Sequence, residues 1–369
     1  MDEHITTDTD TKQIIFSNTP ANFTPAKNTI PNSDSTSTST ITTQSPALTD
    51  TNGSTGTSFF DTVWLSSFIP EICCMLMIAT MALCAQLLNE QEIIFPEIAA
   101  LVVGAWAMPT QPWKTSRLQM FLLMSISSVA GLCFVRFIPG GIYPKVLLAF
   151  LFTACILSLS RTTLIPVISA CILPILLGTD SIVYPCSVCM MTAMIVLLQK
   201  LMECLHIKTA TAYTPAPSIP RETLIQWGMR LVVFAAAAFL PVWFHQYYFI
   251  APPVIVTFVE LSSPDSKVRK QPEKICILIT LCAVIGVLCR FSSNILGLSV
   301  PVGIVIAFLL VLIVFHQLEL YFPPAGAIAL LPFLLHSEGL WFYPIEVACG
   351  TIVFAVCSLL LCRLFAKIR

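Results

Sequence analysis

From about residue 63 to its end, the chain alternates between long apolar runs and short breaks rich in charged residues, Gly or Pro. A run of about 20 apolar residues is long enough to cross the hydrocarbon of a bilayer as a helix. The pattern therefore predicts an all-α polytopic membrane protein with about twelve transmembrane helices. The candidate spans are 63–88, 95–108, 118–137, 143–160, 165–179, 183–202, 224–244, 251–262, 274–291, 297–316, 323–336 and 341–366.

Four of the predicted spans are short and begin at proline. Proline fixes a backbone angle suited to the first turn of a helix and lacks the N–H that would be unpaired there. The run from Pro96 to Met108 has 13 residues, which is about 20 Å of helix against about 30 Å of hydrocarbon. We expect half-helices that begin near the middle of the bilayer, two from each face; the alternative is that the prolines kink or end ordinary tilted spans. The prolines are Pro96, Pro166, Pro252, Pro253, Pro323 and Pro324.

The apolar runs fall into two sets of six that look like copies of one unit. A shift of 158 residues places Pro166 on Pro324 and Pro174 on Pro332. An even number of spans gives both copies the same orientation, as in parallel transporter repeats. The first prolines of the short runs lie 70 residues apart in one copy and 71 in the other. This spacing suggests 3+3 inverted repeats inside each copy, with chance apolar similarity as the alternative.

The predicted domains follow from this division. They are a disordered Ser/Thr-rich tail at 1–60, a transmembrane repeat at 61–204, a cytoplasmic linker at 205–222 and a second transmembrane repeat at 223–369. Polar, low-complexity composition is typical of disordered segments. The tail lacks the basic start and apolar core of a secretion signal, so we expect the first apolar run to be a retained span.

Loop charge predicts the orientation. With twelve spans, most basic loop residues fall on the side of the two termini, and only Arg136, Lys145 and Arg290 fall on the other. The positive-inside rule then places both termini in the cytoplasm. The sequons at Asn22 and Asn52 would be accidental. We expect a multi-pass protein of the plasma membrane, or of the inner membrane if the source is bacterial.

The converging half-helices suggest where a substrate binds. A helix N-terminus presents unpaired N–H groups and a partial positive charge, which favours an anion. Glu97 follows Pro96 directly, at the first turn of a half-helix, where it either carries a coupling proton or caps the helix. Ala325 and Gly326 allow close approach of the backbone. The candidate substrate-binding residues are Pro96, Glu97, Pro166, Pro253, Pro324, Ala325 and Gly326.

Composition excludes several classes of protein. Hydrophobic residues make up 56 % of the chain, charged residues 11 %, and the net charge is −1, which argues against a nucleic-acid partner. The 15 cysteines are scattered through apolar runs and indicate packing rather than disulfides. Cys186 and Cys189 form a Cys-x-x-Cys, for which redox or metal chemistry is the alternative to packing. No nucleotide-binding loop or catalytic motif is present, so we expect no cofactor and no enzymatic activity.

The second half resembles the HPP family of integral membrane proteins. The family signature is His-Pro-Pro followed by Ala/Gly-rich apolar sequence, and here Phe322 stands in place of the histidine before Pro323 and Pro324. In the family a loop with Ser-Pro and Gln-Pro precedes this signature, and Ser263-Pro264 and Gln271-Pro272 resemble that loop. The resemblance covers about residues 247–366 and implies a helical membrane protein, with nitrite transport associated with plant chloroplast members.

Three functions are compatible with these features. The first is a transporter or channel for a small anion, nitrite-like by resemblance, working in a lipid bilayer. The second is a non-transporting scaffold or sensor that acts through its N-terminal tail, and the third is a membrane enzyme. The sequence leaves the substrate, the ion coupling and the oligomeric state open, a homo-oligomer included.

Overall fold

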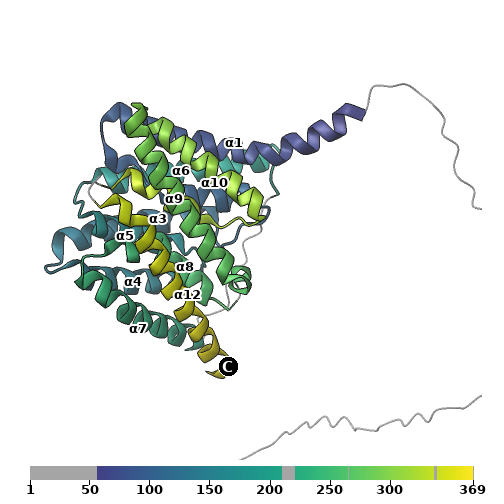
Figure 1. Ribbon diagram of the computed structural model, residues 1–369. Coiled ribbons are helices and arrows are strands. Elements are labelled where there is room, and N and C mark those ends of the chain that lie inside the picture. The colour runs from purple at the N-terminus through teal and green to yellow at the C-terminus, as the bar shows by residue number, and fades with distance from the viewer. Residues whose placement is uncertain (1–55, 210–220, 265, 336–338, 369) are drawn as a thin grey trace, which may run out of the picture. The chain divides into compact units, whose positions relative to one another are not determined.

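The computed structural model describes residues 56–209, 221–264, 266–335 and 339–368 (Figure 1). Within these ranges the chain is helical and contains no strand. The elements are α1 (Gly56–Leu88), η1 (Gln91–Ile93), α2 (Glu97–Val102), η2 (Val103–Ala107), α3 (Arg117–Phe137), α4 (Ile142–Leu159), α5 (Pro166–Leu177), α6 (Val183–Cys204), α7 (Arg221–Trp243), η3 (Tyr247–Ile250), α8 (Pro252–Ser262), η4 (Lys267–Lys270), α9 (Pro272–Leu296), α10 (Val300–Leu318), α11 (Pro323–Leu330), η5 (Leu331–Phe333), η6 (Leu340–Phe342) and α12 (Tyr343–Ile368).

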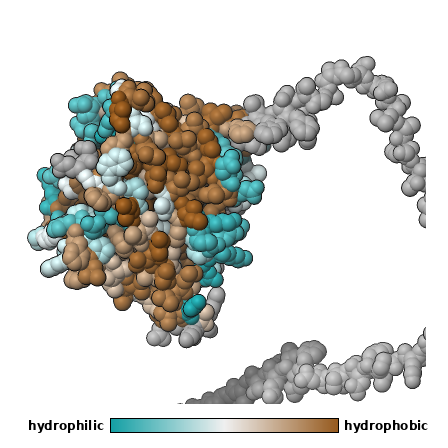
Figure 2. Space-filling view, viewed as in Figure 1, coloured by the Kyte–Doolittle hydropathy of each residue, from teal (hydrophilic) through white to brown (hydrophobic). Residues whose placement is uncertain are grey.

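Eight helices of the described chain are long and apolar enough to cross a membrane: α1, α3, α4, α6, α7, α9, α10 and α12. Their outward side chains include large apolar groups such as Leu87, Met190 and Ile295. Figure 2 shows such side chains covering much of one face, with polar ones gathered at its margins. Every predicted apolar run contains a helix. The predicted count of twelve spans is not confirmed, because α5, α8 and α11 are shorter than a span and α2 is shorter still.

The short helices begin where the prolines predict. Pro166 is the first residue of α5, and the pairs Pro252–Pro253 and Pro323–Pro324 open α8 and α11. Pro96 directly precedes α2, which continues into a π-helical turn, η2. Proline at a helix start costs no backbone hydrogen bond, because the first N–H groups of a helix have no intrahelical acceptor.

The four short helices pack together in the interior of the described bundle. Helix α2 lies against α5 and α11, and α8 lies against the same two helices. Almost every residue in them is buried. Long helices enclose this group, with α3 packed on α5 and α9 packed on α11. Protein therefore covers the short helices along most of their length.

Glycines allow long and short helices to approach each other closely. A Cβ added to Gly131 of α3 would lie 2.3 Å from the carbonyl oxygen of Cys171 in α5. A Cβ added to Gly286 of α9 would lie 2.3 Å from the carbonyl oxygen of Ala329 in α11. Only a residue without a side chain lets the long and short helices approach this closely.

The two halves follow the same order of elements: long helix, 3-10 turn, short helix, two long helices, short helix, long helix. Equivalent hydrogen bonds accompany this order. The Tyr184 hydroxyl at the start of α6 donates to the carbonyl of Ala170 in α5 at 2.8 Å. The Tyr343 hydroxyl at the start of α12 donates to the carbonyl of Ile328 in α11 at 2.7 Å.

Backbone strain recurs at matching places as well. Asn89 after α1 and His245 after α7 have φ values of 55° and 59°. Arg161 after α4 and Glu319 after α10 have φ values of 53° and 49°. A left-handed backbone is uncommon for residues other than glycine. Its recurrence after α1 and α7, and again after α4 and α10, is therefore a further similarity between the two halves.

Several predictions fall outside the described residues. They are the disorder of the tail up to residue 55, the sequons at Asn22 and Asn52, and the part of the linker at 210–220. Helix α1 begins at Gly56, a few residues before the predicted end of the tail at residue 60.

Candidate functional site

The predicted substrate-binding residues lie at the starts of the short helices, and all are buried. Their places are Pro96 as the residue before α2, Glu97 as its first residue, Pro166 as the first residue of α5, Pro253 as the second of α8, and Pro324, Ala325 and Gly326 in the first turn of α11.

The first turns of three short helices meet. The hydroxyl of Ser169, one turn into α5, donates to Oε1 of Glu97 at 2.5 Å. Glu97 is 1 % exposed, and its other carboxyl oxygen, Oε2, has no hydrogen-bond partner among the described residues. A Cβ on Gly326 of α11 would lie 3.3 Å from Cβ of Ala99 in α2. The structure thus brings these predicted residues together as a dense junction.

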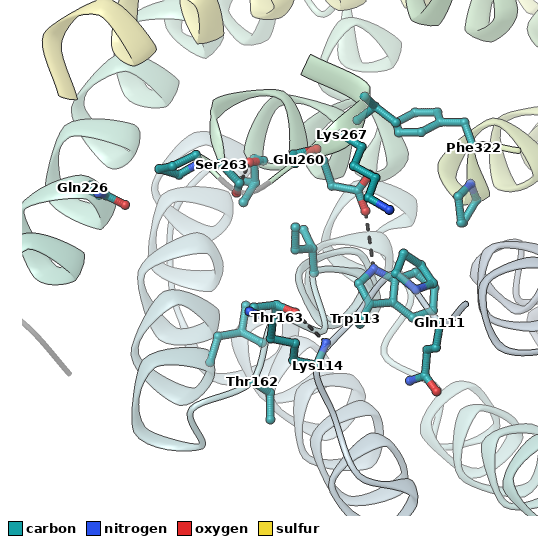
Figure 3. A pocket seen from close by; sticks show the side chains of 18 of the residues that line it. Gln111, Trp113, Lys114, Thr162, Thr163, Gln226, Glu260, Ser263, Lys267 and Phe322 are labelled. Carbon is teal, nitrogen blue, oxygen red and sulfur yellow. Dashed lines mark hydrogen bonds between the residues drawn. The ribbon is translucent and has the colours of Figure 1, made fainter. Parts of the chain in front are cut away.

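A cavity of about 530 Å³ lies beside this junction, between the start of α5, the start of α11, helix α7 and the end of α8 (Figure 3). It borders two helix starts through Ile165, Phe322 and Pro323. None of the seven predicted residues lines it. Sequence reasoning therefore found the helix starts but not the space next to them.

Basic side chains outnumber acidic ones around the cavity. Lys114, Arg161, Arg230 and Lys267 line it, and Glu260 is the one carboxylate among its described lining residues. Lys114 and Lys267 are exposed, whereas Arg230 is only 4 % exposed. The cavity therefore carries a net positive set of side chains, which raises the local concentration of anions.

Arg230 of α7 is held in place by α8. Its Nε donates to the hydroxyl of Ser262 at 2.9 Å, and its Nη2 donates to the Ser262 carbonyl at 3.2 Å. A further bond from Nη2 reaches the hydroxyl of Ser263 at 3.4 Å. The guanidinium lies 4.9 Å from the ring centre of Trp227, which also lines the cavity. A cation at the last residues of α8 stabilises the negative end of that helix.

Glu260 and Trp113 join the ends of two short helices. The indole Nε1 of Trp113 donates to Oε1 of Glu260 at 3.4 Å, a contact that Figure 3 marks. The Trp113 ring covers Gly104 in η2, where an added Cβ would lie 2.4 Å from a ring carbon. The described hydrogen-bond partner of the Glu260 carboxylate is therefore an indole.

The other basic cap belongs to α2. The ammonium of Lys208, just after α6, donates to the carbonyls of Trp106 and Met108 at 3.0 Å each and also to that of Ala105. Burial lowers the pKa of Lys208 to about 8. Three carbonyls at the end of a helix therefore converge on one cation, as the helix dipole favours.

Carboxylates accompany the opposite ends of the same two helices. Glu97 begins α2. Glu346 of α12 accepts from the backbone N–H of Tyr248 at 3.0 Å, shortly before α8 begins. The starts of α2 and α8 thus have negative groups of the protein beside them, whereas the starts of α5 and α11 border the cavity.

Two of these features were missed by sequence reasoning. Arg230 lies within the apolar run 224–244, and an arginine inside such a run is itself a signal of function. The role of Lys208 leaves no local signal, because its acceptors lie about a hundred residues earlier in the chain. Among the described residues no group of three or more His, Cys, Asp or Glu side chains forms a candidate metal site.

Residues 215–369 match the family model described as HPP, transmembrane region. Over this region the chain is similar to the HPP family of membrane proteins. The HPP region contains α7 to α12, with the cavity residues Arg230 and Glu260 and the double proline of α11. The match does not extend over α1 to α6. No curated protein and no solved structure matches the chain.

Proposed function

We propose that this protein is a transporter or channel for anions, and that its substrate enters through the cavity beside α5 and α11. The observation that carries this proposal is a cavity next to the starts of two short helices, whose described lining residues include four basic side chains and one carboxylate. Such helix starts favour negative charge. Substrate sites at broken or short helices are typical of secondary transporters.

The two halves are proposed to be repeats of one six-element unit. Support comes from the shared order of elements, from the Tyr184 and Tyr343 hydrogen bonds, and from the matching glycines Gly131 and Gly286. In such an arrangement the first half, although outside the HPP match, supplies half of the site. Alternating access then arises when one repeat moves against the other around the junction.

The cavity is proposed to open to the cytoplasm. The connections around it carry Lys114, Arg161, Lys208 and Lys267, and basic residues concentrate in cytoplasmic loops. On this view the path continues from the cavity past Pro166 and Pro324 to the junction of first turns. Glu97 is there either the carrier of a coupling proton or a cap for α2.

The test is flux of small anions into proteoliposomes that hold the purified protein, with and without a pH gradient. We expect Pro324→Leu and Gly326→Leu to abolish flux while the protein is still expressed, because both changes fill the junction. The double variant Lys114→Ala/Lys267→Ala should slow flux, whereas Lys200→Ala serves as a matched control on an exposed residue of α6 outside the cavity.

Two outcomes would contradict the proposal. One is normal flux in both Pro324→Leu and Gly326→Leu. The other is an absence of flux for every anion, weak acid and neutral solute tested with a well-folded sample. The second outcome would favour a scaffold or sensor, and deletion of residues 1–55 would then test whether the tail carries that role.

A further inference from the structure

We infer that the ligand of this cavity is an amphipathic organic monoanion, a carboxylate with an aromatic or branched apolar body, rather than a small inorganic ion. The inference deepens the proposed function, because it names the substrate class for the same cavity. It rests on the cavity's size, on the chemistry of its walls and on the position of Glu260, the one carboxylate among its described lining residues.

Size is the first argument. The cavity measures about 530 Å³, which falls within the range of about 300–1,000 Å³ seen for sites that enclose small organic molecules. An inorganic ion of three or four atoms is closer in size to one or two water molecules, each of which occupies about 30 Å³ in the liquid. Such an ion would leave most of the cavity to water.

The walls are the second argument. Among the lining residues, the partly exposed Trp227 and Tyr321 present aromatic surface, and Met108 and Val268 add aliphatic surface. A small hydrated ion gains nothing from contact with these groups, because its binding depends on polar donors that replace its water shell. An aromatic or branched group, in contrast, is stabilised when it leaves water for this surface.

The polar groups define how such a ligand would lie. Arg230 stands against the Trp227 ring and is fixed by Ser262, while Lys114 and Lys267 are exposed lining residues. A ligand whose apolar body rests on the rings can therefore turn its carboxylate toward a cation. A guanidinium pairs well with a carboxylate.

Glu260 sets the limit on ligand charge. It is 9 % exposed, lines the cavity and accepts a hydrogen bond from Trp113. A second carboxylate on the ligand would lie in the same space as Glu260, and like charges in a partly desolvated site repel each other. The cavity is thus suited to a monoanion and unsuited to a dianion of the same shape.

Tryptophan fluorescence offers a direct readout, because Trp113 and Trp227 lie in the cavity walls. The full chain in lipid nanodiscs is titrated with 3-phenylpropionate, phenylsuccinate, 3-phenylpropionamide, formate and nitrite. We expect 3-phenylpropionate to bind at least about ten-fold more tightly than each of the others, since only it combines one negative charge with an apolar body.

Variants separate the cavity from general partition into lipid. Trp227→Leu should weaken binding of 3-phenylpropionate about ten-fold, and Glu260→Gln should tighten binding of phenylsuccinate about ten-fold. Trp341→Leu is the matched control, because Trp341 is an exposed tryptophan that does not line the cavity. It should leave both affinities unchanged.

Each outcome bears on a different claim. Equal affinity for nitrite and 3-phenylpropionate, or unchanged affinity in Trp227→Leu with the Trp113 signal retained, would overturn the inference. If nitrite is transported but 3-phenylpropionate is neither bound nor transported, the inference about the ligand is wrong, although anion transport still holds. Cavity-dependent binding of 3-phenylpropionate without any flux would support the ligand class and count against transport.

Discussion

The close approach of long and short helices can be tested by adding a single methyl group to two glycines. Gly131 of α3 and Gly286 of α9 each face the backbone of a short helix. The substitutions Gly131→Ala and Gly286→Ala place a Cβ 2.3 Å from the carbonyl oxygens of Cys171 and Ala329. Both variants should therefore push α5 or α11 away from its long neighbour.

The expected cost can be worked from these distances. Ordinary van der Waals contact begins at 3.4 Å, so the short helix must move by about 1 Å. The atom in the way belongs to the backbone and cannot rotate aside. Overpacking of this kind typically costs about 1–3 kcal/mol, and we expect the upper end of that range. Alanine returns up to about 1 kcal/mol through its better helix propensity, which leaves a net loss of about 2 kcal/mol.

Gly228 of α7 provides the matched control. A Cβ added there meets no atom within 4 Å, so Gly228→Ala keeps the gain in helix propensity without the clash. Thermal unfolding of the purified variants in detergent, followed by tryptophan fluorescence, should show lower midpoints for Gly131→Ala and Gly286→Ala and an equal or higher midpoint for Gly228→Ala. If all three variants unfold at the same temperature as the original protein, the close approach of long and short helices is wrong.

Three further perturbations address the charged groups. Arg230→Met should destabilise the protein by about 1–3 kcal/mol, because it removes charge-assisted hydrogen bonds to the end of α8; an unchanged unfolding midpoint would contradict that role. Burial lowers the pKa of Lys208 to about 8 from an ordinary value of 10.5, so between these pH values the unfolded chain holds a proton that the folded protein has released. Stability should consequently rise with pH across that window, and Lys208→Met should lose this rise when unfolding midpoints are compared at pH 8 and 10. Glu97→Gln should abolish the effect of a pH gradient on flux if Glu97 carries a coupling proton, whereas a variant that still responds to the gradient would favour the capping role.

Helix positions could be predicted from the sequence because their causes are local. Apolar runs of sufficient length predicted the long helices, and proline predicted where the short ones begin. Pro166 opens α5, and the double proline at residues 323 and 324 opens α11. Each of these signals depends only on the residue itself and on a few neighbours.

The cavity could not be predicted because its walls come from distant parts of the chain. Trp113 precedes α3, Trp227 lies on α7, and Phe322 precedes α11. Their convergence depends on how the helices pack, which no local pattern specifies. The same holds for Lys208, whose acceptors lie at the end of η2. For this reason none of the predicted site residues lines the cavity, although they lie next to it.

The proposed repeat allows the helix starts of the two halves to be compared. Under the shift of 156 residues that aligns Pro96 with Pro252, Glu97 corresponds to Pro253; under the shift of 158, Ser169 corresponds to Ala327. The hydrogen-bonded pair Glu97 and Ser169 therefore has an apolar counterpart in the HPP region.

If the two halves arose by duplication, the polar chemistry of the junction has been concentrated in the first half, while the HPP region supplies Arg230 and Glu260 to the cavity. Each half would then hold a different part of the mechanism. A fragment containing only α7 to α12 would keep the two cavity charges but lose the buried carboxylate. Transport that responds to a pH gradient would accordingly require both halves in one chain.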